Sequence, residues 1–332
     1  MSAKNLIAFT LIAILSISAI FNPYTNQYLG QLKNGYVPVS NGQDELYNQI
    51  KEAAEHYRTE SQDAKIDRVW KAMPGYNGIQ VDEKASYQKM KKNKMFDERK
   101  LVFIQDKPKI HLADLPPAPI YRGHPDKPMV SFLINVAWGN EYIPSILATL
   151  REHKIYATFF LEGRWVKENP ELAKMIADSG HEIGNHSYSH PNMANISNEQ
   201  VKQELIKTND IIEATTNITP TWFGPPSGAY RNETVEIAHA QGLKTVMWTV
   251  DTIDWRKPSP QALIQRVMSN IHPGAMILMH PTESTAKSLD TLITEINAQN
   301  LKIGTVTKLM DEERIIRLDG KQGLKQDETE DR

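Results

Sequence analysis

The sequence predicts an α/β domain built on a parallel sheet, preceded by a smaller α+β module. From residue 128 onward, short apolar runs of strand length alternate with longer amphipathic segments of helical length. This alternation is typical of parallel strands joined by right-handed crossover helices. Dipeptides such as Ser-Gly, Gln-Gly and Pro-Gly separate the segments. The hydrophobic content of 40% is sufficient for a buried core.

Each apolar run predicts one strand, and each intervening segment predicts one helix. The expected strands are residues 129–135, 156–161, 182–184, 221–223, 244–248, 275–279 and 302–304. The expected helices are residues 142–152, 169–179, 198–214, 231–241, 259–270 and 284–298. Ser197 and Gln200 form a capping-box pattern at the start of one of them. Seven such units can close into a barrel, and an open doubly wound sheet is the alternative. The nucleotide-binding form of that sheet has no support, because its glycine-rich motifs do not occur.

The N-terminal part is organised differently. Lys4 precedes an apolar run from Leu6 to Phe21, which fits a secretory signal peptide, with an uncleaved signal anchor as the alternative. We therefore expect the body of the protein outside the cytoplasm, secreted or held at the membrane by this segment. The expected division is a signal at 1–21, a linker at 22–43, a small α+β module at 44–110, a proline-rich connector at 111–127, the large α/β domain at 128–312 and a polar tail at 313–332.

Composition excludes several classes of function. The chain has no cysteine, so disulfides and thiolate chemistry are ruled out, and a bound metal must be held by histidine, carboxylate or water. The net charge of −2 gives no electrostatic reason to expect nucleic acid as a partner.

Polar or conformationally special residues follow the carboxyl ends of several expected strands. Reactive groups gather at these ends in parallel α/β domains, so we expect these residues to meet at one rim. They are Asn135, His186 with His190, the run Gly224-Pro225-Pro226-Ser227, Asp251 with Asp254 and Trp255, and His280.

His186 and His190 are four residues apart, so on one helical turn their rings would face the same way. Two imidazoles in this arrangement can bind a zinc-like ion, and two surface histidines are the alternative.

His280 follows the apolar run AMILM and opens onto the rim, which suits a general acid, although a satisfied imidazole would fit as well. Asp254 could hydrogen-bond to an imidazole and fix its tautomer. Asp251 is better explained as a cap or loop brace. Trp255 could provide a flat face on which a sugar ring stacks, and a tryptophan packed in the core is the alternative.

The segments ATFFLEG, GHEIGNHSYSH, FGPPSGAY, VDTIDW and ILMH together resemble the polysaccharide deacetylase family, the NodB-homology carbohydrate esterases. The similarity runs from about Met129 to Met310. It implies a distorted (β/α) barrel that hydrolyses the amide of N-acetylated sugars in polymers such as peptidoglycan. The most similar subgroup comes from endospore-forming bacilli, which suggests a connection with sporulation.

The resemblance also implies roles for individual residues. A divalent metal, zinc first, would be held by His186, His190 and an aspartate. His280 would protonate the leaving amine, with Asp254 tuning it.

Three further positions would contact the substrate according to the same resemblance. The backbone N–H of Ser227 would share the oxyanion with the metal. Trp255 and Leu278 would line the acetate pocket.

The first and third motifs depart from the family pattern. The family reads TFDDG where this chain reads LINVAWG, so Asn135 falls on the base position, Ala137 supplies no carboxylate, and the metal aspartate is missing. An amide cannot take a proton at neutral pH and is a weak metal ligand. Gly224 replaces the arginine that pairs with the catalytic aspartate in the family. Loss of both charges is coherent, because either one alone would be buried without a partner.

Two hypotheses follow. The first is an extracytoplasmic, metal-dependent N-deacetylase of peptidoglycan-type glycan with a degenerate first motif. The second is a catalytically inactive relative that binds glycan or acts as a scaffold in the cell envelope, with a metal bound weakly or not at all.

Overall fold

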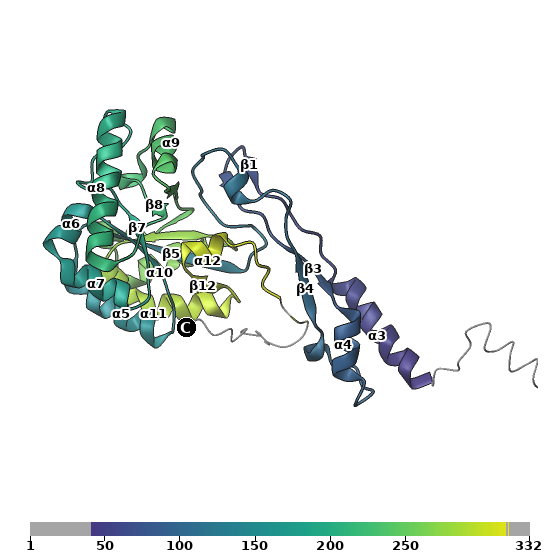
Figure 1. Ribbon diagram of the computed structural model, residues 1–332. Coiled ribbons are helices and arrows are strands. Elements are labelled where there is room, and N and C mark those ends of the chain that lie inside the picture. The colour runs from purple at the N-terminus through teal and green to yellow at the C-terminus, as the bar shows by residue number, and fades with distance from the viewer. Residues whose placement is uncertain (1–40, 317, 319–332) are drawn as a thin grey trace, which may run out of the picture. The chain divides into compact units, whose positions relative to one another are not determined.

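The computed structural model describes residues 41–316 and residue 318 (Figure 1). The expected signal segment, most of the expected linker and most of the polar tail lie outside these residues. The chain forms two compact units, the first from residues 41–56 and 81–102 and the second from residues 57–80 and 103–316. Within the described part of the chain, no helix has both the length and the apolar character needed to cross a bilayer.

The second unit is built on a parallel half-barrel. Its strands are β5 (Met129–Val136), β6 (Thr158–Leu161), β7 (Glu182–Asn185), β8 (Trp222–Phe223), β9 (Lys244–Thr245), β10 (Val250–Asp251), β11 (Met276–Met279) and β12 (Lys302–Gly304). The order is β10-β11-β5-β6-β7-β8-β9, with β12 paired to the start of β5, and every pairing is parallel. The predicted parallel α/β barrel is confirmed. The sequence analysis missed β10, which has only two residues.

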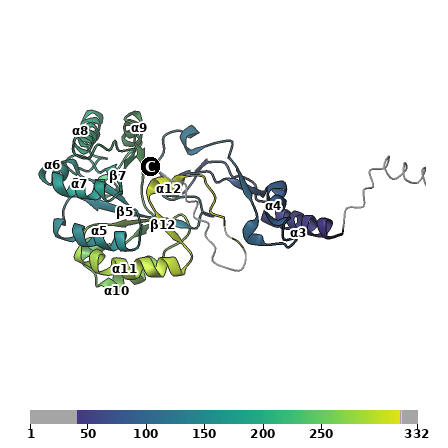
Figure 2. The same cartoon turned by 60° about the horizontal axis from the view of Figure 1, so that its bottom comes forward.

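Helices cover the outer side of this sheet (Figure 1). They are α5 (Ile143–Glu152), α6 (Gly163–Glu168), α7 (Pro170–Asp178), α8 (Asn198–Thr216), α9 (Asn232–Ala240), α10 (Pro260–Met268) and α11 (Glu283–Ala298). Figure 2 shows α10 and α11 packed side by side. The capping box predicted at Ser197 and Gln200 is present at the start of α8.

Strand β5 shows how the two sides of the sheet are divided. Phe132, Ile134 and Val136 are fully buried in the large core between sheet and helices. Leu133 belongs to a separate inner core with Phe160, which α12 (Val306–Met310) helps to close. Because side chains alternate along a strand, Asn135 projects to the inner side, as Leu133 does.

The outer edge of β9 is occupied by the connector. Ile120 forms a parallel bridge to Val246 and an antiparallel bridge to Lys71. Its N–H donates to Thr245 O at 2.9 Å, and its carbonyl accepts the N–H of Met247 at 2.8 Å. Lys71 begins β2 (Lys71–Met73), which pairs with β1 (Lys65–Asp67) in an antiparallel hairpin. Through Ile120, this hairpin continues the sheet beyond β9. A second small sheet pairs β3 (Gly78–Val81) with β4 (Phe103–Asp106).

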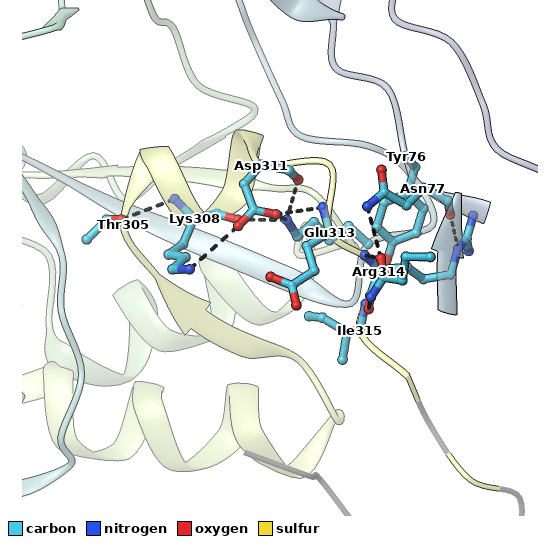
Figure 3. Close-up of polar contacts among 10 residues, drawn as sticks. Tyr76, Asn77, Thr305, Lys308, Asp311, Glu313, Arg314 and Ile315 are labelled. Carbon is cyan, nitrogen blue, oxygen red and sulfur yellow. Dashed lines mark hydrogen bonds and ion pairs between the residues drawn. The ribbon is translucent and has the colours of Figure 1, made fainter. Parts of the chain in front are cut away.

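The chain after α12 joins the barrel to residues 76–77 and 105 through a set of polar contacts that we call the seam (Figure 3). Lys127 is 2% exposed, and its ammonium donates to Lys308 O at 2.7 Å, Asp311 O at 2.5 Å and Asp311 Oδ1 at 3.0 Å. Arg314 lies over the ring of Tyr76, with 3.9 Å between the guanidinium carbon and the ring centroid.

Arg314 also fixes the backbone of this segment at the seam. Its Nε donates to Asn77 O at 2.6 Å, and its backbone N–H donates to Gln105 Oε1 at 2.7 Å. The seam therefore satisfies a buried charge and several backbone groups at once.

The first unit contains α3 (Asn41–Tyr57), whose last residue belongs to the second unit, and α4 (Glu83–Met90). Asp82 caps α4 by accepting the N–H of Ala85 at 2.9 Å. The Tyr47 hydroxyl donates to Glu83 at 2.7 Å, which ties α3 to the start of α4.

Candidate active site

The carboxyl ends of the parallel strands bring the predicted residues to one mouth of the barrel. Met279 pairs with Ile134, so His280 lies level with Asn135 on the neighbouring strand. Asn185 pairs with Phe223, so His186 lies level with Gly224. The expected convergence on one rim follows from this register.

His186 and His190 lie together, but not on a helical turn as the sequence analysis expected. Residues 186–190 form a loop, in which Ser187 and His190 have left-handed backbone angles, with φ of 61° and 56°. The loop folds back so that the two ring centroids are 5.0 Å apart. The sequence spacing correctly predicted that the pair meets, and it was wrong about the conformation.

A carboxylate from helix α8 holds this loop in place. Glu204 accepts the backbone N–H groups of Tyr188 at 2.8 Å and Ser189 at 2.7 Å, and also the Ser189 hydroxyl at 2.8 Å. The sequence analysis did not identify Glu204, because no local pattern distinguishes it from the other charged residues of its helix.

The surroundings of the pair favour neutral imidazoles. The Nδ1–H of His186 donates to Gly224 O at 2.6 Å, which leaves Nε2 with a free lone pair. Burial, reinforced by His190, lowers the pKa of His186 to about 3. Burial also lowers the pKa of His190, and a charge on the nearby His280 would lower both. A neutral imidazole is the form that binds a metal.

His280 is held by a buried carboxylate. Its Nδ1 is 2.8 Å from Asp254 Oδ1, and its backbone N–H donates to Asp254 Oδ2 at 2.5 Å. The Thr285 hydroxyl donates to the same Oδ2 at 2.7 Å. Asp254 is fully buried, so these bonds fix the tautomer of His280, with Nδ1 protonated and Nε2 facing away from Asp254.

Two tryptophans stand at the mouth. Trp138 stacks on His280, with ring centroids 5.8 Å apart and planes 9° from parallel. Trp138 and Trp255 are 47% and 50% exposed, and both line a cavity of about 610 Å³. Trp138 was missed as a site residue, although an exposed tryptophan after a strand end is a recognisable signal.

The other predicted positions have these places. Leu278 is buried on β11. Ser227 is exposed, with a left-handed φ of 53°. Asp251 accepts the N–H of Ile253 at 2.8 Å and so braces its loop.

Comparison with known proteins assigns the chain to a family. The polysaccharide deacetylase domain matches residues 122–246. The chain is 51% identical to the uncharacterized protein YlxY of Bacillus subtilis (strain 168), over 93% of this chain and 97% of that protein. The chain belongs to the polysaccharide deacetylase family.

Two further relatives bear on what this polysaccharide deacetylase homologue does. A CE4 family pseudoenzyme from Bacillus anthracis has a crystal structure that is 57% identical, with a TM-score of 0.79 over 81% of this chain and 96% of that one. A mutant of that pseudoenzyme is described as having restored enzymatic activity. A peptidoglycan-N-acetylglucosamine deacetylase from Bacillus cereus (strain ATCC 14579) is 33% identical over 51% of this chain and 63% of its own length.

The metal site that this family implies does not fit the residues present. Among the described residues, no three histidine or carboxylate side chains are grouped so that they could hold an ion. His186 and His190 supply two nitrogen ligands, and a catalytic zinc site ordinarily has three protein ligands. Glu141, the first carboxylate after Asn135, is exposed and lines the tryptophan cavity.

The register shows which position lacks the carboxylate. Val136 pairs with Leu161, and Leu161 pairs with Asn185, so the next residue on each strand places Ala137 level with His186. Asn135 is 6% exposed and lies two residues deeper, level with His280. Ala137, rather than Asn135, is therefore the residue closest in register to the histidine pair.

Arg231, the nearest downstream arginine, does not replace the missing one. Arg231 donates to Met193 O at 3.0 Å and to the Asn198 side chain, and its Nε lies 3.3 Å from Glu233. A side chain at Gly224 would begin 3.1 Å from the Phe160 ring, so a larger residue there would require the ring to shift by a few tenths of an ångström.

Proposed function

We propose that this protein binds N-acetylated glycan of the cell envelope in the mouth of the barrel without efficient deacetylation. The observation that carries the proposal is the pairing of two imidazoles with no third histidine or carboxylate ligand among the described residues. Kinship with peptidoglycan deacetylases indicates the kind of ligand, and the likeness to a pseudoenzyme supports the loss of turnover.

The retained residues suit binding. Trp138 and Trp255 present flat apolar faces on which a sugar ring can stack. His280 is fixed by Asp254 and can exchange a hydrogen bond through Nε2 with a hydroxyl or acetamido group.

The place of action is the extracytoplasmic face of the membrane or the wall. This rests on the apolar run from Leu6 to Phe21 and on the glycan named for the relatives. The N-terminal segment would hold the protein at the membrane if it is not cleaved.

Slow deacetylation is the second candidate. The observation that favours it is the complete His280–Asp254–Thr285 arrangement, which a binding site alone does not need. Loss of a general base costs about 10²–10⁴-fold in rate, so residual turnover would be weak.

Acetate release from N-acetylglucosamine oligomers, with zinc or cobalt added, separates the two. We expect binding of the oligomers without acetate above the level of a heat-inactivated sample. Metal-dependent acetate release that His186→Ala abolishes would favour the second candidate and overturn the first.

A further inference from the structure

We propose that residues 89–95 of the first unit, which we call the basic turn, dock on the surface of a bilayer that contains anionic phospholipids. This inference rests on the place of action proposed above, at the membrane, and it does not involve the mouth of the barrel.

The backbone of the basic turn is anchored to buried structure in its own unit. The turn starts in the last residues of α4 and continues beyond the end of this helix at Met90. Met90 is fully buried, and its carbonyl accepts the N–H groups of Asn93 at 3.1 Å and Lys94 at 3.2 Å. The Met90 sulfur also accepts the N–H of Asp97 at 3.4 Å. The turn is therefore a hydrogen-bonded element, from which the side chains between Met90 and Phe96 project into solvent.

The lysines of the basic turn carry charge that no carboxylate of the described residues offsets. Four of them are exposed and have no ion pair within this part of the chain, namely Lys89, Lys91, Lys92 and Lys94. The carboxylate of Asp97 is already paired with Arg99 at 3.0 Å and with Lys100 at 3.7 Å. The turn therefore has an excess of positive charge, which is complementary to an anionic surface.

The end of a helix attracts lysines in any case, because cations there interact favourably with the helix dipole. This explains Lys89, in the last turn of α4, and Lys91, at its C-cap. It does not explain Lys92 and Lys94, which lie beyond the helix end. Stability of α4 alone therefore does not account for the basic turn.

Met95 indicates which anionic partner fits. Its side chain is 72% exposed, more than any other large apolar side chain in the described part of the chain. A soluble polyanion offers charges for the lysines but no apolar layer for this methionine. A bilayer surface offers headgroup phosphates to the ammonium groups and an apolar boundary just beneath them. The combination of lysines with an exposed Met95 therefore favours a bilayer.

The sequence also places the first unit next to the expected membrane segment. This unit begins at α3, and residues 22–40, which join α3 to the apolar run from Leu6 to Phe21, can span at most about 65 Å. Helices α3 and α4 lie side by side, and the rings of Tyr47 and Tyr87 meet edge to face with centroids 6.1 Å apart (Figures 1 and 2). An apolar run that stays in the bilayer would therefore keep the basic turn at a high local concentration beside it.

A fluorescent label on the basic turn tests this inference in the full chain, which has no cysteine of its own. Met95→Cys is labelled with a polarity-sensitive fluorophore and mixed with vesicles of phosphatidylglycerol and phosphatidylcholine. We expect the emission to shift to the blue. Sodium chloride at about 1 M should largely remove the shift, because the Debye length falls to about 3 Å. Replacing Lys91, Lys92 and Lys94 together by glutamine should also remove most of it.

Two matched controls are available in the second unit. Exchange of Lys167, Lys202 and Lys207 for glutamine removes three exposed lysines of α6 and α8, and it should leave the shift unchanged. Tyr156→Cys, labelled in the same way, places the fluorophore at an exposed position of the barrel and should give no shift.

The outcomes separate this inference from the proposed function. The inference is wrong if the anionic vesicles give no shift, if phosphatidylcholine alone gives the same shift, or if both label positions respond equally. A label that responds to inorganic polyphosphate but not to vesicles would assign the turn to a soluble polyanion instead. Binding of N-acetylglucosamine oligomers is measured separately, so its failure would overturn the proposed glycan binding and leave the vesicle result standing.

Discussion

The seam keeps a buried charge together with its partners, whereas the mouth of the barrel lacks both charges of the pair that the family pattern predicts. At the seam, Lys127 is almost fully buried and has three oxygen partners, one of them the carboxylate of Asp311. At the mouth, both members of the charge pair expected from the family pattern are absent, with Ala137 or Asn135 at the acid positions and Gly224 at the basic one.

The comparison indicates that a buried charge such as that of Lys127 is kept together with its oxygen partners, whereas at the mouth both members of the expected pair are lost together. Removing one member leaves the other desolvated and unpaired, whereas removing both leaves a neutral site. The fold therefore tolerates an altered mouth, and we expect it not to tolerate a half-broken seam.

Restoring a charge at the mouth should give the largest effect. Ala137→Asp places a carboxylate level with His186 and completes a set of three potential metal ligands. We expect zinc-dependent acetate release from N-acetylglucosamine oligomers to rise by about 10²–10⁴-fold over the wild type. Asn135→Asp is the matched control, two residues deeper on the same face, and should gain much less. Equal or greater gain from Asn135→Asp would show that the register argument is wrong.

Breaking the seam should cost stability. Lys127→Ala removes a donor from two carbonyls and from the Asp311 carboxylate, which still accepts the N–H of Glu313 at 2.7 Å, and we expect the free energy of unfolding to fall by about 1–3 kcal/mol. Urea unfolding followed by circular dichroism measures this. Lys308→Ala removes an exposed lysine 3.7 Å from the same carboxylate and should change stability by less than about 1 kcal/mol. Similar losses in both variants would mean that burial of the charge is not what matters.

Acid should weaken the region beside the seam by a smaller amount. His124 stacks on Tyr76, donates from Nε2 to Gln62 and accepts the N–H of Asp126 at Nδ1, and burial lowers its pKa to about 4. Because the unfolded pKa is about 6.5, the unfolded chain binds more protons between these values. The stability contribution is complete above about pH 6.5 and is lost as pH falls toward 4, by about 1–2 kcal/mol at pH 5.

Urea midpoints measured across this range for His124→Gln and the wild type test the expectation. The variant should be less stable at pH 7 and should lose less on acidification. His239→Gln, at an exposed histidine, should leave the wild-type pH dependence unchanged. Other buried histidines such as His186 also have lowered pKa values, so part of the slope should remain in the variant, but a slope as steep as that of the wild type would show that His124 does not contribute.

Local patterns predicted the parallel barrel well. Runs such as 129–135 and 275–279 coincide with β5 and β11 within one residue, because a strand buried on both faces is a continuous apolar run. The two-residue strand β10 and the five-residue helix α12 are too short to show a period.

The site was predictable in its members and less so in its geometry. The spacing of His186 and His190 indicated that they meet, but left-handed backbone angles in a loop are not visible in spacing alone. The role of Glu204 depends on tertiary contacts, and the position of Ala137 level with His186 depends on strand register. The contacts of Lys127 at the seam join residues more than 180 positions apart, which no local pattern reveals.

Ile120 pairs with the edge strand of the barrel sheet. It hydrogen-bonds to the residues on either side of Val246 and forms a bridge to Lys71. The backbone groups at the edge of β9 are therefore already paired and cannot pair with another molecule. A fragment cut at Arg122, where the match to the family domain begins, would lack Ile120, expose this edge and favour strand-to-strand association. The smallest piece that stays monodisperse therefore starts upstream of the hairpin, at a point that the catalytic motifs alone do not reveal.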